Sequence, residues 1–239
     1  MKWDFTTQDM IVMSSPAIAE GKVFIGSLDH NVYALNASDG MLLWKFTTGD
    51  MILSSPTINN ETVYVGSYDN KIYALDSKKG NLIWEFETGG NISSSPAVSE
   101  GILYIGANDD KVYALDAETG DQIWSFATRG DVASSPAVAD NVLYFGSYDN
   151  KVYALNAFDG SMIWNYQTNN IVVSSPAIAD GRLYIGSYDH LVYAFGSQGD
   201  SQVDLVQKDW VILLSSSVVI LGVTLAIFLL WKNRRQQHS

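Results

Sequence analysis

The chain has 239 residues, of which 47% are hydrophobic and 12% are aromatic, and it contains no cysteine. Its 26 acidic residues outnumber its 14 basic residues, so its formal net charge is −12 at pH 7. This charge repels phosphate backbones and argues against a nucleic-acid-binding protein. The lack of cysteine excludes disulfides and thiolate metal sites.

A unit of 40 residues recurs five times between residues 3 and 196. Each copy contains Ser-Ser-Pro, which begins at Ser14, Ser54, Ser94, Ser134 and Ser174. Four short runs in each copy are rich in β-branched and aromatic residues, and they alternate with turn sequences rich in Asn, Asp and Gly. A period of this length with this composition is typical of propeller blades, each built from four strands.

The second copy illustrates the strands that we expect in every blade. Its apolar runs lie at residues 55–59, 62–66, 71–75 and 82–86, and we name the corresponding strands A to D. Such short runs with polar turns between them favour a meander of antiparallel strands over a helical repeat. The sequence therefore predicts an all-β propeller domain over residues 1–196.

The two ends of the repeat region complement each other. Strand D carries Trp and then an aromatic residue two positions later, but the fifth copy stops at Gly196 before this signature. The signature occurs instead at Trp3 and Phe5, with no strands A to C in front of it. We therefore expect a closed ring of five four-stranded blades in which the N-terminal strand, residues 1–7, completes the last blade. The alternative is a fragment of a larger ring of about seven or eight blades.

A motif at the turn between strands C and D carries a resemblance to a known family. Residues 114–124 read Ala-Leu-Asp-Ala-Glu-Thr-Gly-Asp-Gln-Ile-Trp and resemble the tryptophan-docking motif of quinoprotein alcohol dehydrogenases. The whole unit is similar to the pyrroloquinoline quinone (PQQ)-like β-propeller repeat, and the match covers most of the chain. The resemblance implies that each Trp packs across the interface between blades and that the Gly lets the backbone come close. These docking residues are Trp3, Trp44, Trp84, Trp124 and Trp164, with Gly40, Gly80, Gly120 and Gly160.

The resemblance also raises the question of a cofactor. Enzymes of that family hold the quinone beside a calcium ion with acidic ligands and an aspartate base, often with a disulfide between adjacent cysteines. This chain has no cysteine, and its similar copies contain no single acidic cluster that breaks the repeat symmetry. We therefore predict no bound quinone, no calcium, no other metal and no catalytic residue. In this respect the chain resembles the non-enzymatic branch of the family, which includes the propeller lipoprotein of the outer-membrane β-barrel assembly machinery.

The turns between strands B and C hold the candidate binding residues. They combine an aromatic side chain with a carboxylate and an amide, a set that suits stacking on a sugar or gripping a peptide. The candidates are Asp29, His30, Tyr68, Asp69, Asn70, Tyr148, Asp149, Asn150, Tyr188, Asp189 and His190. The alternative is that Asp and Asn only form the turns, since both residue types favour tight turns.

Beyond the repeats lies an uncharged run of 20 residues that begins at Val211 and ends at Leu230. A helix of that length spans about 30 Å, the hydrocarbon thickness of a bilayer. Trp210 and Trp231 flank the run, as interfacial aromatic residues do. We predict a linker over 197–209, one transmembrane helix over 210–231 and a basic tail over 232–239.

Charge sets the expected orientation of this single-pass protein. All 26 acidic residues and 11 of the 14 basic residues precede Trp210, whereas three basic residues follow the apolar run. By the positive-inside rule, the tail is cytoplasmic and the propeller lies outside the cytoplasm. No signal peptide precedes the first repeat, so either the start of the chain lies upstream or the chain is tail-anchored with a cytoplasmic propeller.

Three functional classes fit these features, and the binding class fits best. We expect a membrane-anchored propeller that acts as a protein-binding or ligand-binding scaffold without catalysis, with near-equivalent sites that add avidity. A lectin-like glycan receptor is the first alternative, and a PQQ-dependent oxidoreductase is the second. The expected partners are the membrane and a protein or glycan on the face that carries the B–C turns.

Overall fold

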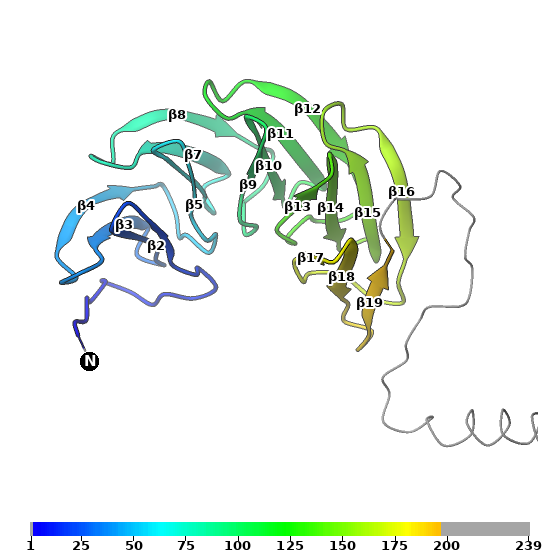
Figure 1. Cartoon of the computed structure of the whole chain (residues 1–239), viewed down its shortest axis with the longest axis horizontal. Helices are drawn as coiled ribbons and strands as arrows, with labels where there is room; N and C mark the ends of the chain where they lie inside the picture. The colour runs from blue at the N-terminus through cyan, green and yellow to red at the C-terminus, as the bar shows by residue number, and fades with distance from the viewer. Residues whose placement is uncertain (1, 197–239) are drawn as a thin grey trace, which may run out of the picture. The chain divides into compact units, whose positions relative to one another are not determined.

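The computed structural model of the chain describes residues 2–196. This part is all-β, and its strands form five antiparallel sheets, one for each sequence repeat, as in a propeller (Figure 1). The predicted linker, transmembrane helix and basic tail over 197–239 lie outside the described residues. Within residues 2–196, no helix is long and apolar enough to cross a membrane.

Each of the first four sheets has four strands, and the fifth has three. The first sheet contains β1 (Ala17–Ala19), β2 (Lys22–Gly26), β3 (Asn31–Asn36) and β4 (Leu42–Thr47). The second contains β5 (Thr57–Asn59), β6 (Thr62–Gly66), β7 (Lys71–Asp76) and β8 (Leu82–Glu87). The third contains β9 (Ala97–Ser99), β10 (Ile102–Ala107), β11 (Lys111–Asp116) and β12 (Gln122–Ala127). The fourth contains β13 (Ala137–Ala139), β14 (Val142–Ser147), β15 (Lys151–Asn156) and β16 (Met162–Gln167), and the fifth contains β17 (Ala177–Ala179), β18 (Arg182–Gly186) and β19 (Val192–Phe195).

Local sequence explains where the strands end. In the second sheet, the turn after β5 places Asn60 at φ 46° and Glu61 at φ 63°, and the turn after β6 places Asn70 at φ 72°. Positive φ values strain most L-residues but are tolerated by Asn and Asp, so Asn60 and Asn70 suit these reversals of the chain. The strands predicted from the second repeat agree with β5 to β8 within two residues at each end.

The hydrophobic core consists of apolar layers between successive sheets. Side chains alternate along a strand, so Val32 and Ala34 of β3 face the second sheet, whereas Tyr33 and Leu35 point the other way. Val32 and Ala34 are fully buried in one cluster with Leu75 of β7. We call the face of a sheet that packs on the next sheet its forward face, and the opposite face its rear face. Equivalent clusters join the second to the third, the third to the fourth and the fourth to the fifth sheet.

A tryptophan docked on a glycine closes the outer end of these layers. The Nε1–H of Trp44 in β4 donates a 3.1 Å hydrogen bond to the Ser77 carbonyl of the second sheet, and the indole ring lies against Gly80. A Cβ atom at Gly80 would lie 2.6 Å from the ring, and Gly80 has φ +71°, so glycine suits this position on both counts. The arrangement recurs at Trp84 with Ala117 and Gly120, and at Trp124 with Ala157 and Gly160.

The N-terminal segment lies on the rear face of the first sheet and forms no strand. The Nε1–H of Trp3 donates a 3.1 Å hydrogen bond to the Ala37 carbonyl, and its ring lies against Gly40. Phe5 meets Tyr33 edge-on, with 5.4 Å between the ring centroids. The segment therefore makes the docking contacts that a strand D makes on the sheet that follows it.

The strand pairing predicted for the same segment is absent from the described structure. The fifth sheet contains only β17, β18 and β19, and no strand of the described residues pairs with the free edge of β19. Within residues 2–196, the ring closure predicted from residues 1–7 is therefore not observed. The N-terminal segment and β19 lie at opposite ends of the row of sheets (Figure 1). The repeat pattern showed that the N-terminal segment carries the residues of a strand D. It did not show the angle between successive sheets, because side-chain packing sets that angle.

Replacing Gly120 by Ala should weaken the contact between the second and third sheets. The new Cβ would lie 2.7 Å from the Trp84 ring, at a position with φ +80°. Gly101→Ala is the matched control, because Gly101 has φ +76° but nothing within 4 Å of an added Cβ. Each substitution introduces about 1–2 kcal/mol of left-handed backbone strain, and overpacking should cost Gly120→Ala about 1–3 kcal/mol more. Equal free energies of unfolding for the two variants in urea titrations would contradict this docking geometry.

Candidate ligand-binding site

A central cavity is lined by the segments that lead into the first strand of every sheet. Its volume is about 440 Å³, and serine and aliphatic side chains form most of its wall. The lining residues are Met13, Ser15, Leu53, Ser55, Tyr68, Ser93, Ser95, Asn108, Ala133, Ser135, Tyr148, Val173 and Ser175. The Ser-Ser-Pro sequences thus reach the cavity wall through the second serine of each pair.

These second serines form a hydrogen-bonded belt around the cavity. The backbone N–H of Ser15 donates to Ser55 Oγ over 2.8 Å, and equivalent bonds join Ser55 to Ser95, Ser95 to Ser135 and Ser135 to Ser175. The bonds satisfy backbone donors that lie outside the sheet ladders. We call these five residues the serine belt. The belt was not predicted from the sequence, although the 40-residue spacing of the serine hydroxyls was the signal that could have revealed it.

Tyrosine side chains stand at one mouth of the cavity. Tyr68 and Tyr148 line it directly, and Asn108 occupies the equivalent position in the third sheet. Tyr148 is 41% exposed, and Tyr188, the equivalent residue of the fifth sheet, is 60% exposed. The pKa of the Tyr148 phenol is raised, by burial first and then by the neighbouring Tyr188, Asp131 and Tyr68. Of the predicted B–C turn residues, Tyr68 and Tyr148 therefore line the cavity, and Tyr188 lies close enough to Tyr148 to affect its pKa.

The aspartate carboxylates of the same turns accept hydrogen bonds from other parts of the chain. Asp69 Oδ2 accepts a 2.7 Å hydrogen bond from the Tyr73 hydroxyl and a 2.6 Å bond from the N–H of Gly49, while its Oδ1 accepts the N–H of Lys71. A tyrosine hydroxyl and a backbone N–H likewise reach Asp29, Asp109, Asp149 and Asp189. Each carboxylate ties its sheet to the segment that leads into that sheet or out of the one before it. The tyrosine rings of these turns make no such bonds within residues 2–196, so they remain available to a ligand.

The third residue of each candidate turn has a left-handed backbone. His30, Asn70, Asn150 and His190 have φ values between 66° and 72°. The carbonyls of His30, Asn70 and Asn150 accept hydrogen bonds from threonine N–H groups. His30 Nε2 also lies 3.9 Å from Asp50 Oδ1. Among residues 2–196, no group of three or more His, Asp or Glu side chains is arranged to hold a metal ion.

The third and fourth sheets depart from the repeat symmetry beside the cavity. The pKa of the Asp131 carboxyl is raised, by burial first and then by the adjacent Asp110 carboxylate. Asn108 donates its Nδ2–H to Asn91 Oδ1 over 2.8 Å, and its own Oδ1 is buried without a partner in the described part of the chain. Sequence analysis did not identify Asp131 or Asn108 as site residues. The available signal was that Asn108 stands where three repeats have tyrosine, and that Asp131 stands where three repeats have an apolar residue.

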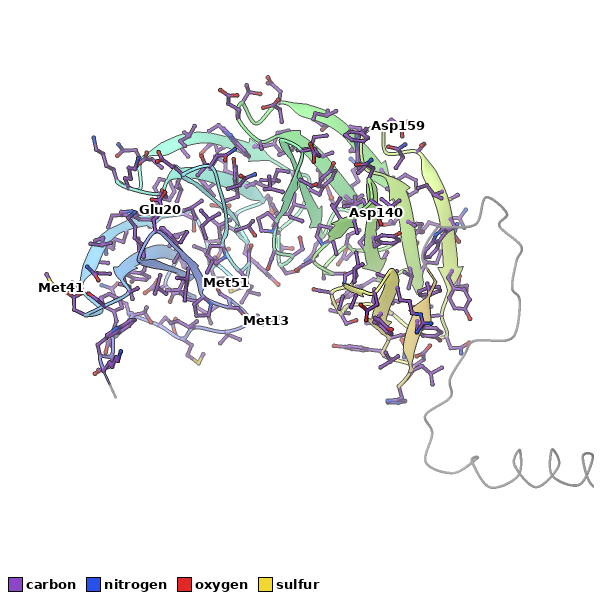
Figure 2. All side chains as sticks on the ribbon, in the orientation of Figure 1. Met13, Glu20, Met41, Met51, Asp140 and Asp159 are labelled. Atoms are coloured by element: carbon purple, nitrogen blue, oxygen red, sulfur yellow. The ribbon has the colours of Figure 1, made fainter. Side chains whose placement is uncertain are left out.

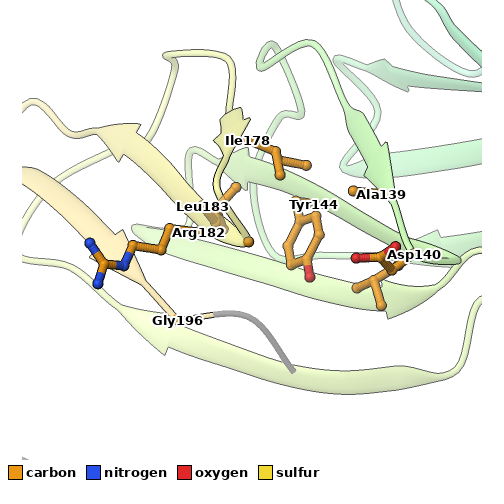
Figure 3. Close-up of a pocket in the computed structure, with 9 residues that line it drawn as sticks. Ala139, Asp140, Tyr144, Ile178, Arg182, Leu183 and Gly196 are labelled. Atoms are coloured by element: carbon orange, nitrogen blue, oxygen red, sulfur yellow. The ribbon is translucent and has the colours of Figure 1, made fainter. Parts of the chain in front are cut away.

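A second cavity, of about 80 Å³, lies between the fourth and fifth sheets. Figure 3 shows the Tyr144 ring in it, between Asp140 and the strand that carries Leu183. The equivalent hydroxyl of Tyr104 donates a 3.0 Å hydrogen bond to the Ala157 carbonyl in the turn after β15. The corresponding turn after β19 lies beyond the described residues, so this cavity does not define a site.

One protein family matches the chain by sequence. Its model, described as outer membrane protein assembly factor BamB, matches residues 2–93 and 87–206. The two matches together extend over all five repeats. Among curated protein sequences, none matches the chain.

Solved structures resemble the chain at low sequence identity. BamB from Moraxella catarrhalis superposes with a TM-score of 0.71 and 22% identity over 82% of this chain and 61% of that protein. Quinohemoprotein alcohol dehydrogenase ADHIIG from Pseudomonas putida HK5 gives 0.69 and 22% over 81% of this chain and 42% of that protein. A computationally designed protein gives 0.69 and 17% over 76% of this chain and 57% of that protein. The chain thus spans less than two thirds of the length of each, and these likenesses establish the fold alone.

Buried tyrosines set an alkaline limit to the stability of the fold. The pKa of Tyr33 is raised to about 12, by burial first and then by its hydrogen bond to the Asp29 carboxylate. The same causes raise the pKa values of Tyr73, Tyr113 and Tyr153. A raised pKa favours the neutral phenol in the folded state. The resulting stabilisation is complete below the unfolded pKa of about 10 and is lost as the pH rises through the folded value.

We therefore expect the fold to lose stability above about pH 10 and to unfold cooperatively near or above about pH 12. An alkaline titration that records tyrosinate absorbance and far-UV circular dichroism together should show two groups of tyrosines. The exposed group ionises first, and the buried group ionises only as the strand signal is lost. Tyr33→Phe identifies one member of the second group. Ionisation of every tyrosine near its ordinary pKa, with the strand signal intact, would contradict the burial described for these side chains.

Proposed function

Because the chain belongs to the PQQ-like β-propeller family whose model is described as outer membrane protein assembly factor BamB, we propose that it is a membrane-anchored scaffold that binds a protein segment without catalysis. The proposed binding site is the central cavity, with the serine belt in its wall and Tyr68 and Tyr148 at its mouth. The observation that carries the proposal is the chemistry of this wall, which combines hydroxyls, aliphatic side chains and tyrosine rings.

This wall suits a polypeptide in an extended conformation. Serine hydroxyls supply donors and acceptors for peptide groups, and Leu53 and Val173 supply apolar contacts. Tyr68 and Tyr148 add rigid amphipathic rings of the kind that are enriched in protein interfaces. Such a wall recognises main chain in general, which fits a scaffold better than an enzyme.

The same wall does not fit the quinone cofactor of the related dehydrogenases. Pyrroloquinoline quinone carries several carboxylates, which need cationic partners, and its calcium ion needs carboxylate ligands. The cavity-lining residues within 2–196 include no Lys, Arg, Asp or Glu. The nearby turn carboxylates, such as Asp69, already accept hydrogen bonds from the protein. These observations support a scaffold that works without quinone, calcium or another metal.

The proposal includes the membrane anchor and the orientation expected from the sequence. Residues 211–230 would cross the bilayer, and the basic tail over 232–239 would remain in the cytoplasm. The propeller and its cavity would then lie outside the cytoplasm, close to the membrane surface.

A protease added to intact spheroplasts tests this orientation. It should degrade the propeller but spare an epitope placed after Ser239, because the epitope is cytoplasmic. A soluble cytoplasmic protein provides the control for intact membranes. Protection of the propeller until the membrane is lysed would contradict the proposed orientation and favour the tail-anchored alternative.

Replacing Tyr68 and Tyr148 together by Ala should weaken peptide binding by the full-length chain at least tenfold, because buried interface tyrosines each contribute about 1–2 kcal/mol or more. Binders are selected from a random library of unstructured peptides, and their affinities are measured by fluorescence anisotropy. Phe158→Ala is the matched control, since Phe158 is an aromatic residue that is 48% exposed in a turn at the opposite end of the strands.

A glycan array probed with the same three proteins separates the two binding alternatives. The scaffold proposal requires that peptides bind and that Phe158→Ala leaves their affinity unchanged. Glycan binding that depends on Tyr68 and Tyr148, without peptide binding, would contradict the proposal and favour the lectin-like receptor. Equal peptide affinity of all three proteins would place any binding site outside the cavity.

A further inference from the structure

The forward face of the fifth sheet is exposed, although every other forward face is buried. Val192 of β19 is 70% exposed, and Ala194 on the same face of this strand is also exposed. The residues equivalent to Val192 in the other sheets are Val32, Ile72, Val112 and Val152, all fully buried. The fifth sheet therefore presents to solvent a surface that the other four sheets use for packing.

The rear face of the first sheet is exposed in a complementary way. Ile18 of β1 is 72% exposed. Its equivalents pack on the preceding sheet as partly buried members of the apolar clusters, and these are Ile58, Val98, Val138 and Ile178. Met13, which is 69% exposed, lies at the inner end of the first sheet, whereas Met41 lies at its outer rim (Figure 2). In the described part of the chain, no sheet packs on the rear face of the first sheet, where Trp3 and Phe5 give only partial cover.

These two exposed faces are the two halves of one interface that occurs four times inside the chain. In the first internal interface, Val32 and Ala34 of the forward face share a cluster with Ile58 and Tyr73 of the next rear face. The second and third interfaces use the same four positions, and the fourth uses three of them, at Val152, Ile178 and Tyr193. A forward face that lacks its partner, and a rear face of the kind that covers it, are therefore present on the same chain.

A contact between a branched side chain and a glycine also shows that the fifth and first sheets carry complementary faces. Ile52 is fully buried over Gly26, so closely that a Cβ atom added to this glycine would meet its Cγ2 at 2.3 Å. The equivalent Gly186 of the fifth sheet has only Ser174 within 4 Å of an added Cβ. Ile11 follows Asp9-Met10 as Ile52 follows Asp50-Met51, and it is 46% exposed. Gly186 of the fifth sheet is therefore not covered by a branched side chain, and Ile11 of the N-terminal segment does not pack on a glycine as Ile52 does.

The serine belt also ends in complementary groups. Its bonds run from the N–H of one serine to the Oγ of the serine in the next sheet. Within residues 2–196, the Oγ of Ser15 accepts no bond of this series and the N–H of Ser175 donates none. A bond from Ser175 of one chain to Ser15 of another would continue the series.

We propose that the forward face of the fifth sheet binds the rear face of the first sheet of a second copy, so that copies associate head to tail. A second copy is the occupant because it carries the rear face that covers the other four forward faces, together with Ile11 and the Ser15 hydroxyl. The chain's own first sheet does not cover its fifth, since both faces are exposed in one structure and lie at opposite ends of the row (Figure 1). The contact joins two different surfaces, so it permits further copies to add in the same direction.

Substitutions at positions that are already exposed test this proposal without disturbing the core. Val192→Asp places a charge on the forward face, and Ile18→Asp places one on the rear face. Leu43→Asp is the matched control, because Leu43 is 45% exposed on the outer strand β4, away from both faces. The full-length proteins are compared in detergent micelles by sedimentation velocity over a concentration series. The unsubstituted chain and Leu43→Asp should associate over the same range, and each end-face variant alone should associate at least tenfold more weakly.

Mixing the two end-face variants gives the sharper readout. Val192→Asp keeps an intact rear face and Ile18→Asp keeps an intact forward face, so the mixture should form one contact and stop at a dimer. An interface made from the same surface on both copies would not be restored by mixing. The proposal is overturned if the unsubstituted chain is monomeric at every concentration. It is also overturned if both end-face variants associate like Leu43→Asp, or if their mixture remains monomeric.

Discussion

The packing of each forward face on the next rear face is the interaction on which the rest of the structure depends. A single small sheet buries too little apolar surface to be stable alone, so each repeat needs its neighbours. Two glycine contacts set the approach of the sheets: a tryptophan ring on Gly80 at the outer end and an isoleucine on Gly26 at the inner end. Because the same contacts recur between successive sheets, the spacing of one interface is also the spacing of the next.

The cavity and its tyrosines follow from this spacing. Because the sheets pack on one another in the same way, the segments before their first strands all reach the central cavity. The serine belt joins these segments there. The turn carboxylates stabilise the arrangement, because Asp69 binds the Tyr73 hydroxyl of its own sheet and the Gly49 N–H that follows the preceding sheet. With the carboxylates occupied, hydroxyls and tyrosine rings form the wall. The site is therefore a product of repetition, and Asn108 and Asp131 are local departures from it.

Much of this could be predicted from the sequence, because it depends on contacts whose residues recur every 40 positions. The strands, the docking of Trp44 on Gly80 and the gathering of the tyrosines belong to this class. Closure of the ring does not, since it depends on an angle that accumulates over several interfaces. The N-terminal segment also takes a path of its own: it has one residue more before its Ser-Ser-Pro than the later crossovers, and Met13 adopts φ 65°. The buried oxygen of Asn108 could not be foreseen either, because its environment comes from a neighbouring repeat.

The sheets complete one another face to face, and within residues 2–196 the fifth sheet has neither a fourth strand nor a neighbour on its forward face. Hydrogen–deuterium exchange of the full-length chain, at a concentration too low for association, tests this claim most directly. Amides of β19 should exchange orders of magnitude faster than those of the equivalent β15, because β19 pairs only with β18 whereas β15 pairs on both sides. Equal protection of β19 and β15 would show that another strand covers the free edge, and it would contradict the open arrangement on which the account depends.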